Sequence, residues 1–216
     1  GTVNAAVTGL YGWGGEILVL PGGTKNLLSK RLHGVQDAPT ILRRIAGGAY
    51  RPVRPLIARC EAGNAFAGML VGPGSAWANV REAMRDFDVA AMAQGASDAM
   101  TKSTEGGMVR CVDPIAGRAD GYPLIDFTPS HRGLQLDGYS AGGTGEVLQH
   151  SWAVLQGNFR DGPKDRIGLF DEITLENTAG EPIELTIDGE AATLPARATF
   201  QVAPCEVDLL ATDHGF

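Results

Sequence analysis

The sequence lacks any long hydrophobic run. No apolar stretch approaches the ~18 residues that a membrane-spanning helix needs, and no signal peptide is visible. The chain begins with Gly1 rather than methionine, so we expect a fragment, a processed product or a trimmed chain.

Cysteine and histidine are scarce and scattered. The three cysteines, Cys60, Cys111 and Cys205, form no CxxC pair and have no histidine at metal-ligand spacing. The four histidines form no metal motif either. This pattern favours buried thiols in a reducing cytoplasm over disulfide or zinc chemistry.

The net charge of −7 is unevenly distributed. Residues 1–60 carry eight basic and two acidic side chains, a net of +6, while the remainder carries ten basic and twenty-three acidic ones, a net of −13. The basic head favours an anion such as a nucleotide or a lipid phosphate, although a solvated charged face explains the same count. The acidic remainder argues against general nucleic-acid binding.

Hydrophobic periodicity changes near residue 50. Residues 1–49 have the pattern of one strand among helices, which is an incomplete α/β segment because a stable sheet needs several strands. Residues 50–216 have the pattern of short strands separated by turn residues, with strongly helical stretches at 75–105 and 144–156. The predicted fold class is therefore α+β, a β-sandwich with helical insertions preceded by a partial α/β segment.

Individual segments give more local predictions. In the first part, 3–10 and 26–31 are predicted helices, 16–20 is a strand, and a third helix starts at Asp37 and ends at Gly47. In the second part, 158–166 is predicted to be a polar loop. The predicted strands are 51–59, 64–71, 107–112, 122–127, 134–140, 172–176, 183–187, 199–202 and 207–210.

The stretch LPGGTKN, residues 20–26, follows the predicted strand and opens the next helix. Gly22 and Gly23 allow an anion to approach the backbone, and Thr24 is a good N-cap with a hydroxyl of its own. The GxxxxGK[ST] spacing of a P-loop is absent. Two interpretations stay open at this point, a phosphate-holding turn and a plain capped helix.

Two further features carry candidate chemistry. Asp188 and Glu190 flank Gly189 after a predicted strand, and they would point to one face if the chain stayed extended. Two such acids can divide work in phosphoryl transfer, although Asp-Gly is also a favoured hairpin turn. Gly1 and Thr2 start the first predicted helix. Like the glycines and threonine of residues 22–24, they could hold an anion at a helix start.

Together these features resemble the diacylglycerol kinase-like lipid kinases, which include sphingosine kinases and bacterial lipid kinases. Their GGDGT loop is similar to residues 1–4, GTVN. Their P-x-GT-x-N motif is matched by residues 21–26, PGGTKN, and their D-G-E motif by residues 188–190. The order and spacing fit over essentially the whole chain.

The resemblance implies that ATP, with Mg²⁺, gives its γ-phosphoryl group to the hydroxyl of a diacylglycerol-like lipid. It makes Glu190 the proton acceptor and Asp188 a support for nucleotide or metal. It places residues 1–49 in a nucleotide-binding domain and 50–216 in the lipid-kinase β-sandwich domain, where a lipid pocket is expected. The implied nucleotide-binding residues are Gly1, Thr2, Asn4, Gly22, Gly23, Thr24 and Asn26.

The sequence also departs from the family pattern. Ala5 and Leu27 stand where family members usually have Glu and Asp, and Arg132 replaces the acid of a D-G-L loop that binds a structural Mg²⁺ in many bacterial members. Asp137–Gly138 is a rival placement for that loop, but the strand register fits it less well. The metal ligands are therefore unassigned. These departures support an alternative, a non-catalytic lipid- or nucleotide-binding module derived from the family.

The resemblance also implies partners and a location. The substrate is a lipid alcohol, so we expect a cytoplasmic protein with peripheral contact to the membrane. An incomplete sheet leaves edges that can pair between chains, which makes a homodimer a further expectation. Because the preceding half of the nucleotide cleft is missing from this sequence, we expect the chain alone to be inactive.

Overall fold

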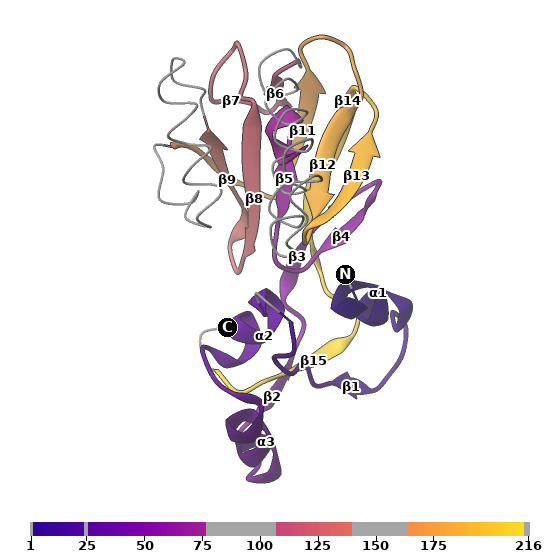
Figure 1. Cartoon of the computed structure of the whole chain (residues 1–216), viewed down its shortest axis with the longest axis vertical. Helices are drawn as coiled ribbons and strands as arrows, with labels where there is room; N and C mark the ends of the chain where they lie inside the picture. Colours follow the sequence, from indigo (N-terminus) through magenta and orange to yellow (C-terminus); the bar gives the residue numbers. More distant parts are fainter. Residues whose placement is uncertain (1, 24–25, 77–106, 140–163, 214–216) are drawn as a thin grey trace, which may run out of the picture.

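The computed structural model describes residues 2–23, 26–76, 107–139 and 164–213. Two six-stranded antiparallel sheets form the upper part of the molecule, which we call the sandwich (Figure 1). The first sheet runs in the order β4 (Gly63–Ala65), β3 (Leu56–Cys60), β14 (Arg197–Pro204), β11 (Glu172–Asn177), β6 (Val109–Asp113), β7 (Ile115–Ala116). The second runs β10 (Asp165–Phe170), β9 (Gly133–Tyr139), β8 (Leu124–Ser130), β5 (Met69–Val71), β12 (Ile183–Ile187), β13 (Glu190–Leu194). A 3₁₀ turn at Pro73–Ala76 follows β5.

The two sheets bury their facing side chains in one core. Alternate residues of β8 and β14 point inward, as the period of two in a strand requires. Across the gap, the rings of Phe127 and Phe200 approach to 4.7 Å between centroids, and both residues are fully buried. The sandwich is therefore a rigid platform for the turns at its ends.

Below the sandwich lies a second unit, which we call the small lobe (Figure 1). It contains α1 (Thr2–Gly9), α2 (Leu27–His33), α3 (Ala38–Ala46) and a three-stranded sheet in the order β1 (Glu16–Ile17), β15 (Asp208–Ala211), β2 (Arg51–Val53). β15 lies parallel to β1 and antiparallel to β2. The C-terminal strand thus completes a sheet begun by the N-terminal segment.

The small lobe has its own core. It joins α1 and α2 to the three-stranded sheet, and it also takes in residues at the base of the sandwich. Its buried members are Val7, Val19, Leu28, Leu32, Ile57, Phe66, Ala203, Cys205, Val207, Leu209 and Ala211. Because Ile57 and Phe66 belong to segments of the sandwich, the two units share packing and are not joined by a linker alone.

The structure confirms the α+β class and most of the predicted elements. The expected helix at 3–10 is α1, and α3 is capped by Asp37, whose side chain accepts a hydrogen bond from the Thr40 N–H. The division at residue 50 stays a prediction, since the three-stranded sheet takes strands from both sides of it. The predicted helices at 75–105 and 144–156 fall almost wholly outside the described residues.

Several element boundaries were predicted wrongly. Segment 51–59 is two strands, β2 and β3, because the chain passes from one sheet to another at Arg54 and Pro55, and Pro55 has no N–H to donate. Segment 64–71 is also two strands, β4 and β5, separated by residues 66–68. The start of β10 lies in a predicted loop, and the edge strand β13 was not predicted.

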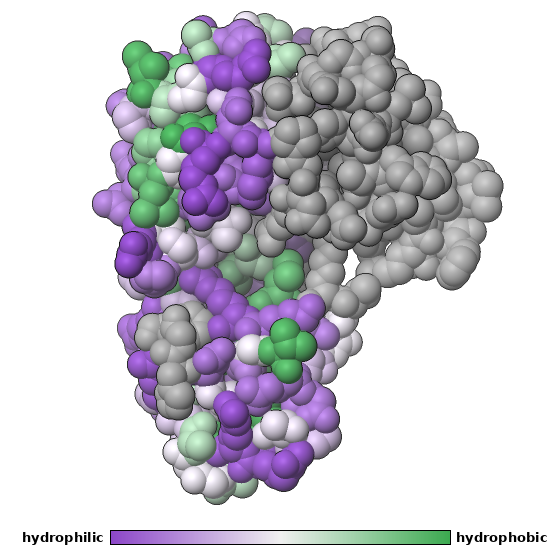
Figure 2. Space-filling view, turned by 90° about the vertical axis from the view of Figure 1, so that its left-hand side faces the viewer, coloured by the Kyte–Doolittle hydropathy of each residue, from purple (hydrophilic) through white to green (hydrophobic). Residues whose placement is uncertain are grey.

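Figure 2 shows hydrophilic side chains over most of the small lobe in that view, with isolated hydrophobic ones between them. Among the residues that the structure describes, no helix is both long and apolar enough to cross a bilayer.

A buried histidine ties α2 to the two segments that follow the parallel strands β1 and β15. The His33 side chain is fully buried, with Nε2 3.1 Å from the Val19 carbonyl oxygen and Nδ1 3.0 Å from the Thr212 hydroxyl. A carbonyl only accepts, so Nε2 carries the proton and Nδ1 accepts from the hydroxyl. Burial lowers the pKa of His33, against a smaller opposing effect of the Val19 hydrogen bond.

His33 should therefore make the fold sensitive to acid. In the unfolded chain the imidazole titrates near its ordinary pKa of about 6.5, whereas the folded chain keeps it neutral to lower pH. The unfolded state then binds more protons, so stability is lost as the pH falls below about 6.5 towards the folded pKa.

Urea unfolding at pH 5 to 7.5 checks this prediction. We expect the stability advantage of the natural chain over His33→Gln to shrink as the pH falls, because glutamine does not titrate. An advantage that is constant across this range would contradict the assignment of a neutral, buried imidazole.

Candidate functional site

The Asp188–Gly189 pair is a two-residue hairpin turn between β12 and β13. Ile187 pairs with Glu190, and the turn residues have φ angles of 51° and 97°. Both angles lie in the left-handed region that Asp-Gly turns require, so glycine is needed at position 189. The chain is therefore not extended through the D-G-E motif, and the condition for one shared face is not met. Asp188 is half-buried and Glu190 is exposed.

The Asp188 carboxylate is surrounded by hydrogen-bond donors. Its Oδ1 accepts from the backbone N–H groups of Ala67, at 2.8 Å, and Gly68, at 3.1 Å. Its Oδ2 accepts from the Phe66 N–H, at 3.0 Å, and from the Asn4 side-chain amide, at 2.7 Å. A carboxylate offers about four acceptor positions, so these four bonds occupy its normal capacity.

Asn4 connects α1 to this turn. Its Nδ2 donates to the backbone oxygen of Asn64, at 2.6 Å, as well as to Asp188. Its Oδ1 lies 3.4 Å from the Thr8 hydroxyl one helical turn later. The first and third predicted motifs are thus in direct contact, although Asn4 and Asp188 are 184 residues apart in the sequence.

The second motif forms a separate loop around Gly22 and Gly23, which we call the glycine loop. This loop is held by hydrogen bonds within the motif itself. Asn26 is the N-cap of α2 in a left-handed conformation, and its Oδ1 accepts from the N–H groups of Gly22, at 3.0 Å, and Gly23, at 2.7 Å. The predicted capping residue, Thr24, is therefore corrected to Asn26, because the helix begins at Leu27. An αL residue before the first turn sends the Asn26 side chain back onto the loop.

The same loop leaves room for a ligand. A Cβ placed on Gly22 would meet nothing within 4 Å, so packing does not require glycine there. The two N–H groups converge on one oxygen, that of the Asn26 side chain, in the way that they would converge on a phosphate oxygen. The predicted phosphate contact would require an anion to replace the amide oxygen of Asn26, and it stays a prediction.

The remaining predicted site residues have varied positions. Thr2 is the exposed first residue of α1, and Glu190 is the exposed first residue of β13. Gly1 and Thr24 lie outside the described residues. The nucleotide-binding and catalytic assignments stay predictions.

Sequence reasoning missed the loop that receives Asp188. Residues 66–68 connect β4 to β5 and supply three of the four donors to the carboxylate. Its one sequence signal is Gly68, which has a φ of 157° and lies so close to β8 that a Cβ would be 2.7 Å from the Phe127 carbonyl oxygen. A glycine within an apolar run indicates such a close approach, but not its partner.

The predicted position of the D-G-L loop is a tight hairpin turn. The Ser130 hydroxyl donates to the Gly133 carbonyl and accepts from the Arg132 N–H, which closes the turn between β8 and β9 without an acid. Among the described residues, no group of three or more His, Cys, Asp or Glu side chains is arranged to hold a metal ion.

The nearby acid, Asp137, already forms hydrogen bonds with other side chains of the sandwich. It lies buried within β9 and bonds to Lys164 and Gln135, each at 2.9 Å. Burial by itself would raise the pKa of Asp137, but these two hydrogen bonds and the Lys164 charge outweigh it and lower the pKa. Asp137 is thus an ionised, paired carboxylate in the sandwich.

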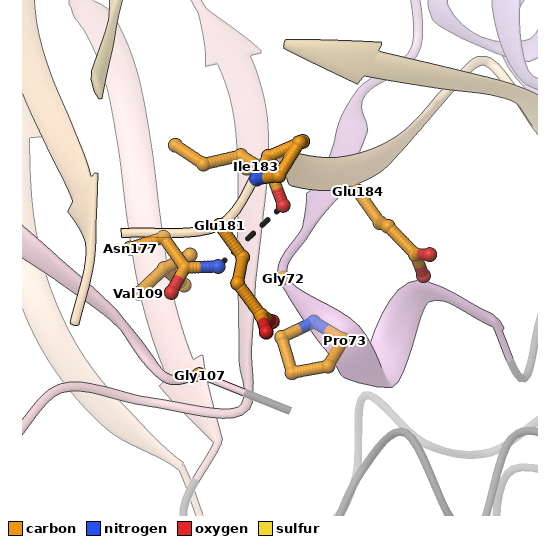
Figure 3. Close-up of a pocket in the computed structure, with 9 residues that line it drawn as sticks. Gly72, Pro73, Gly107, Val109, Asn177, Glu181, Ile183 and Glu184 are labelled. Atoms are coloured by element: carbon orange, nitrogen blue, oxygen red, sulfur yellow. Dashed lines mark hydrogen bonds between the residues drawn. The ribbon is translucent and has the colours of Figure 1, made fainter. Parts of the chain in front are cut away.

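A cavity of about 160 Å³ lies at the other end of β12 from the Asp188–Gly189 turn. Its wall includes Pro73, Glu181 and Glu184, and Figure 3 shows the Asn177 amide directed to the Pro182 backbone oxygen, 3.5 Å away. Nothing in its lining identifies a lipid site, so the predicted lipid pocket stays a prediction.

Two solved structures from Bacillus anthracis strain Sterne share this fold. One is a diacylglycerol kinase, with a TM-score of 0.52 and 13 % identity over 92 % of this chain and 68 % of that one. The other is a candidate diacylglycerol kinase, with a TM-score of 0.57 and 16 % identity over 92 % of this chain and 70 % of that one. No protein-family model and no curated protein matches the sequence. The likeness confirms, at the level of fold, the resemblance seen in the motifs.

The Asp188 contacts lead to a stability prediction. In Asp188→Asn, the side-chain NH₂ would face the Asn4 amide and the Phe66 N–H, two donors that it cannot satisfy. We expect a loss of about 1–3 kcal/mol in the free energy of unfolding, the usual cost of leaving such groups unpaired. Urea denaturation measures this loss.

Glu190→Gln is the matched control, since it makes the same chemical change two residues later at an exposed side chain. We expect it to change stability by no more than about 0.5 kcal/mol. Equal stabilities of the two variants would refute the anchoring role of the Asp188 carboxylate.

Proposed function

We propose that this chain forms part of an ATP-dependent lipid kinase, which transfers the γ-phosphoryl group to the hydroxyl of a diacylglycerol-like lipid. The observation that carries the proposal is the contact between Asn4 and Asp188, which joins two of the three motifs across the whole chain. The fold shared with a Bacillus anthracis diacylglycerol kinase supports it.

In this proposal Glu190 is the proton acceptor. Its side chain is exposed at the start of β13, and the two-residue turn before it fixes its backbone. When bound, ATP supplies the phosphoryl group. The lipid O–H bond breaks and its proton passes to Glu190, while the lipid oxygen bonds to phosphorus and ADP departs.

The glycine loop is the proposed phosphate contact. Gly22 and Gly23 would exchange the Asn26 oxygen for a phosphate oxygen, and Thr2, Asn4 and Thr24 would lie along the nucleotide. The described residues do not make up a Mg²⁺ site, since the acceptor positions of Asp188 are filled by protein donors. We therefore assign no step to the metal, although phosphoryl transfer of this kind uses one.

A second candidate function is a non-catalytic nucleotide- or lipid-binding module. Leu27, at a position where the resemblance leads us to expect Asp, is a 41 % exposed side chain at the start of α2. In the glycine loop and at the Asp188 carboxylate, the hydrogen-bonding groups are paired within the protein. A binding module without catalytic activity would also show this. A nucleotide-binding assay and a turnover assay separate the two functions.

The proposed substrate determines where in the cell the protein would act. A lipid alcohol is reached at a membrane surface, so we propose peripheral contact by a cytoplasmic protein. β13 and β10 are the outermost strands of their six-stranded sheet, and pairing there between two chains would give the proposed homodimer.

The role of Glu190 is tested in a longer parent protein with measurable lipid phosphorylation. We expect Glu190→Gln to lower kcat at least about 100-fold, because general-base catalysis contributes ~10²–10⁴-fold. Glu172→Gln, which alters an exposed acid at the start of β11, serves as the control and should leave kcat unchanged.

Circular dichroism confirms that both variants are folded. Retained activity in Glu190→Gln would remove Glu190 from the mechanism. The same assay applied to the 216-residue chain should give no product, because the chain matches only 68 % of the similar kinase's length. ATP-dependent phosphorylation by the chain alone would contradict this part of the proposal.

A further inference from the structure

The loop of residues 66–68 is the place where the sandwich enters the small lobe. Its flanking residues, Ala65 and Met69, belong to the sandwich core, whereas Phe66 is 1 % exposed and packs in the small-lobe core with Leu28 and Leu32 of α2. One short loop therefore has its ends in one core and its largest side chain in the other.

The backbone of this loop is held on one side by Asp188. The three N–H groups of Phe66, Ala67 and Gly68 donate to the carboxylate, and the Asp188 N–H donates in return to the Gly68 carbonyl at 3.0 Å. This reciprocal set of bonds fixes the loop relative to the β12–β13 turn. Glu190 begins β13 directly after that turn.

The other side of the loop is held by Arg31 of α2. Its Nη1 donates to the Phe66 carbonyl oxygen at 3.0 Å. Burial lowers the pKa of Arg31, and the negative charge of Asp188 acts in the opposite direction. The guanidinium is thus a half-buried cation that is attracted by the carboxylate at the other edge of the same loop.

We propose that Arg31 is a positioning residue, which fixes the 66–68 loop against α2 and thereby sets where Glu190 stands relative to the glycine loop. The connection runs from α2 through Arg31 to the Phe66 carbonyl, and from the loop N–H groups through Asp188 to the turn that carries Glu190. The effect on catalysis rests on the proposed function. The structural connection from α2 to the β12–β13 turn does not depend on it.

The alternative role for Arg31 is direct contact with a nucleotide phosphate. The two roles differ in what a loss of the guanidinium changes. A positioning residue alters the loop in the absence of any ligand, whereas a phosphate contact alters only nucleotide affinity. Measurements on the ligand-free protein therefore separate them.

The test is amide hydrogen exchange, followed residue by residue by NMR, in Arg31→Met, Arg31→Lys and Arg43→Met. Arg43 is an exposed arginine of α3 whose side chain donates to the Thr40 hydroxyl in the same helix, so it is the matched control. In Arg31→Met we expect exchange of the Phe66, Ala67 and Gly68 N–H groups to accelerate about tenfold or more, because a buried carbonyl loses its donor.

Arg31→Lys should restore part of the protection, and Arg43→Met should match the natural chain. Exchange at Phe127, in the middle of β8, reports whether the sandwich as a whole has loosened. Unchanged protection of the three loop groups in Arg31→Met would overturn the proposal. If that variant does not fold, the intermediate exchange expected of Arg31→Lys still decides, and full protection there would refute it.

An active parent protein allows the catalytic consequence to be measured. There Arg31→Met should lower kcat about tenfold with little change in KM for ATP, since the chemistry depends on the placement of Glu190. A raised KM with kcat unchanged would instead identify Arg31 as a phosphate contact and overturn the positioning role. If Glu190→Gln retains activity, the proposed role of Glu190 and the catalytic consequence of Arg31 fail, while the exchange result stands.

Discussion

The Asp188 carboxylate is the interaction on which the rest of the site depends. It accepts hydrogen bonds from α1, through Asn4, and from the three N–H groups of the loop that reaches the small-lobe core. Each donor comes from a part of the chain that is remote in sequence. The carboxylate therefore forms contacts that local sequence preferences do not determine. An acid in this place therefore joins α1, the 66–68 loop and the β12–β13 turn through its own hydrogen bonds.

Local chemistry made part of this arrangement predictable. Asp-Gly at 188–189 indicated a hairpin, and Asp37 indicated the start of α3, because each signal acts over a few residues. The α+β class followed from hydrophobic periodicity in the same way. These predictions needed no knowledge of which segments meet in space.

The remainder depended on long-range contacts. The apolar run at 64–71 looks like one strand, and only the distant Asp188 explains why it divides at Phe66. The edge strand β13 exposes most of its side chains, so it has no hydrophobic pattern to detect. Asn26 was expected to meet a nucleotide, but its bond to the glycine loop depends on a left-handed backbone that the sequence does not reveal.

We propose that the glycine loop and the Asp188 anchor form two sides of one nucleotide site, with only the loop changing partner on binding. NMR titration of this chain with ATP tests it most directly. The account predicts shifts at the Gly22 and Gly23 N–H groups, as they exchange the Asn26 oxygen for phosphate, with the Phe66–Gly68 N–H groups unmoved. Shifts at the Asp188-bound groups without any at the glycines, or no shifts at millimolar ATP, would contradict it.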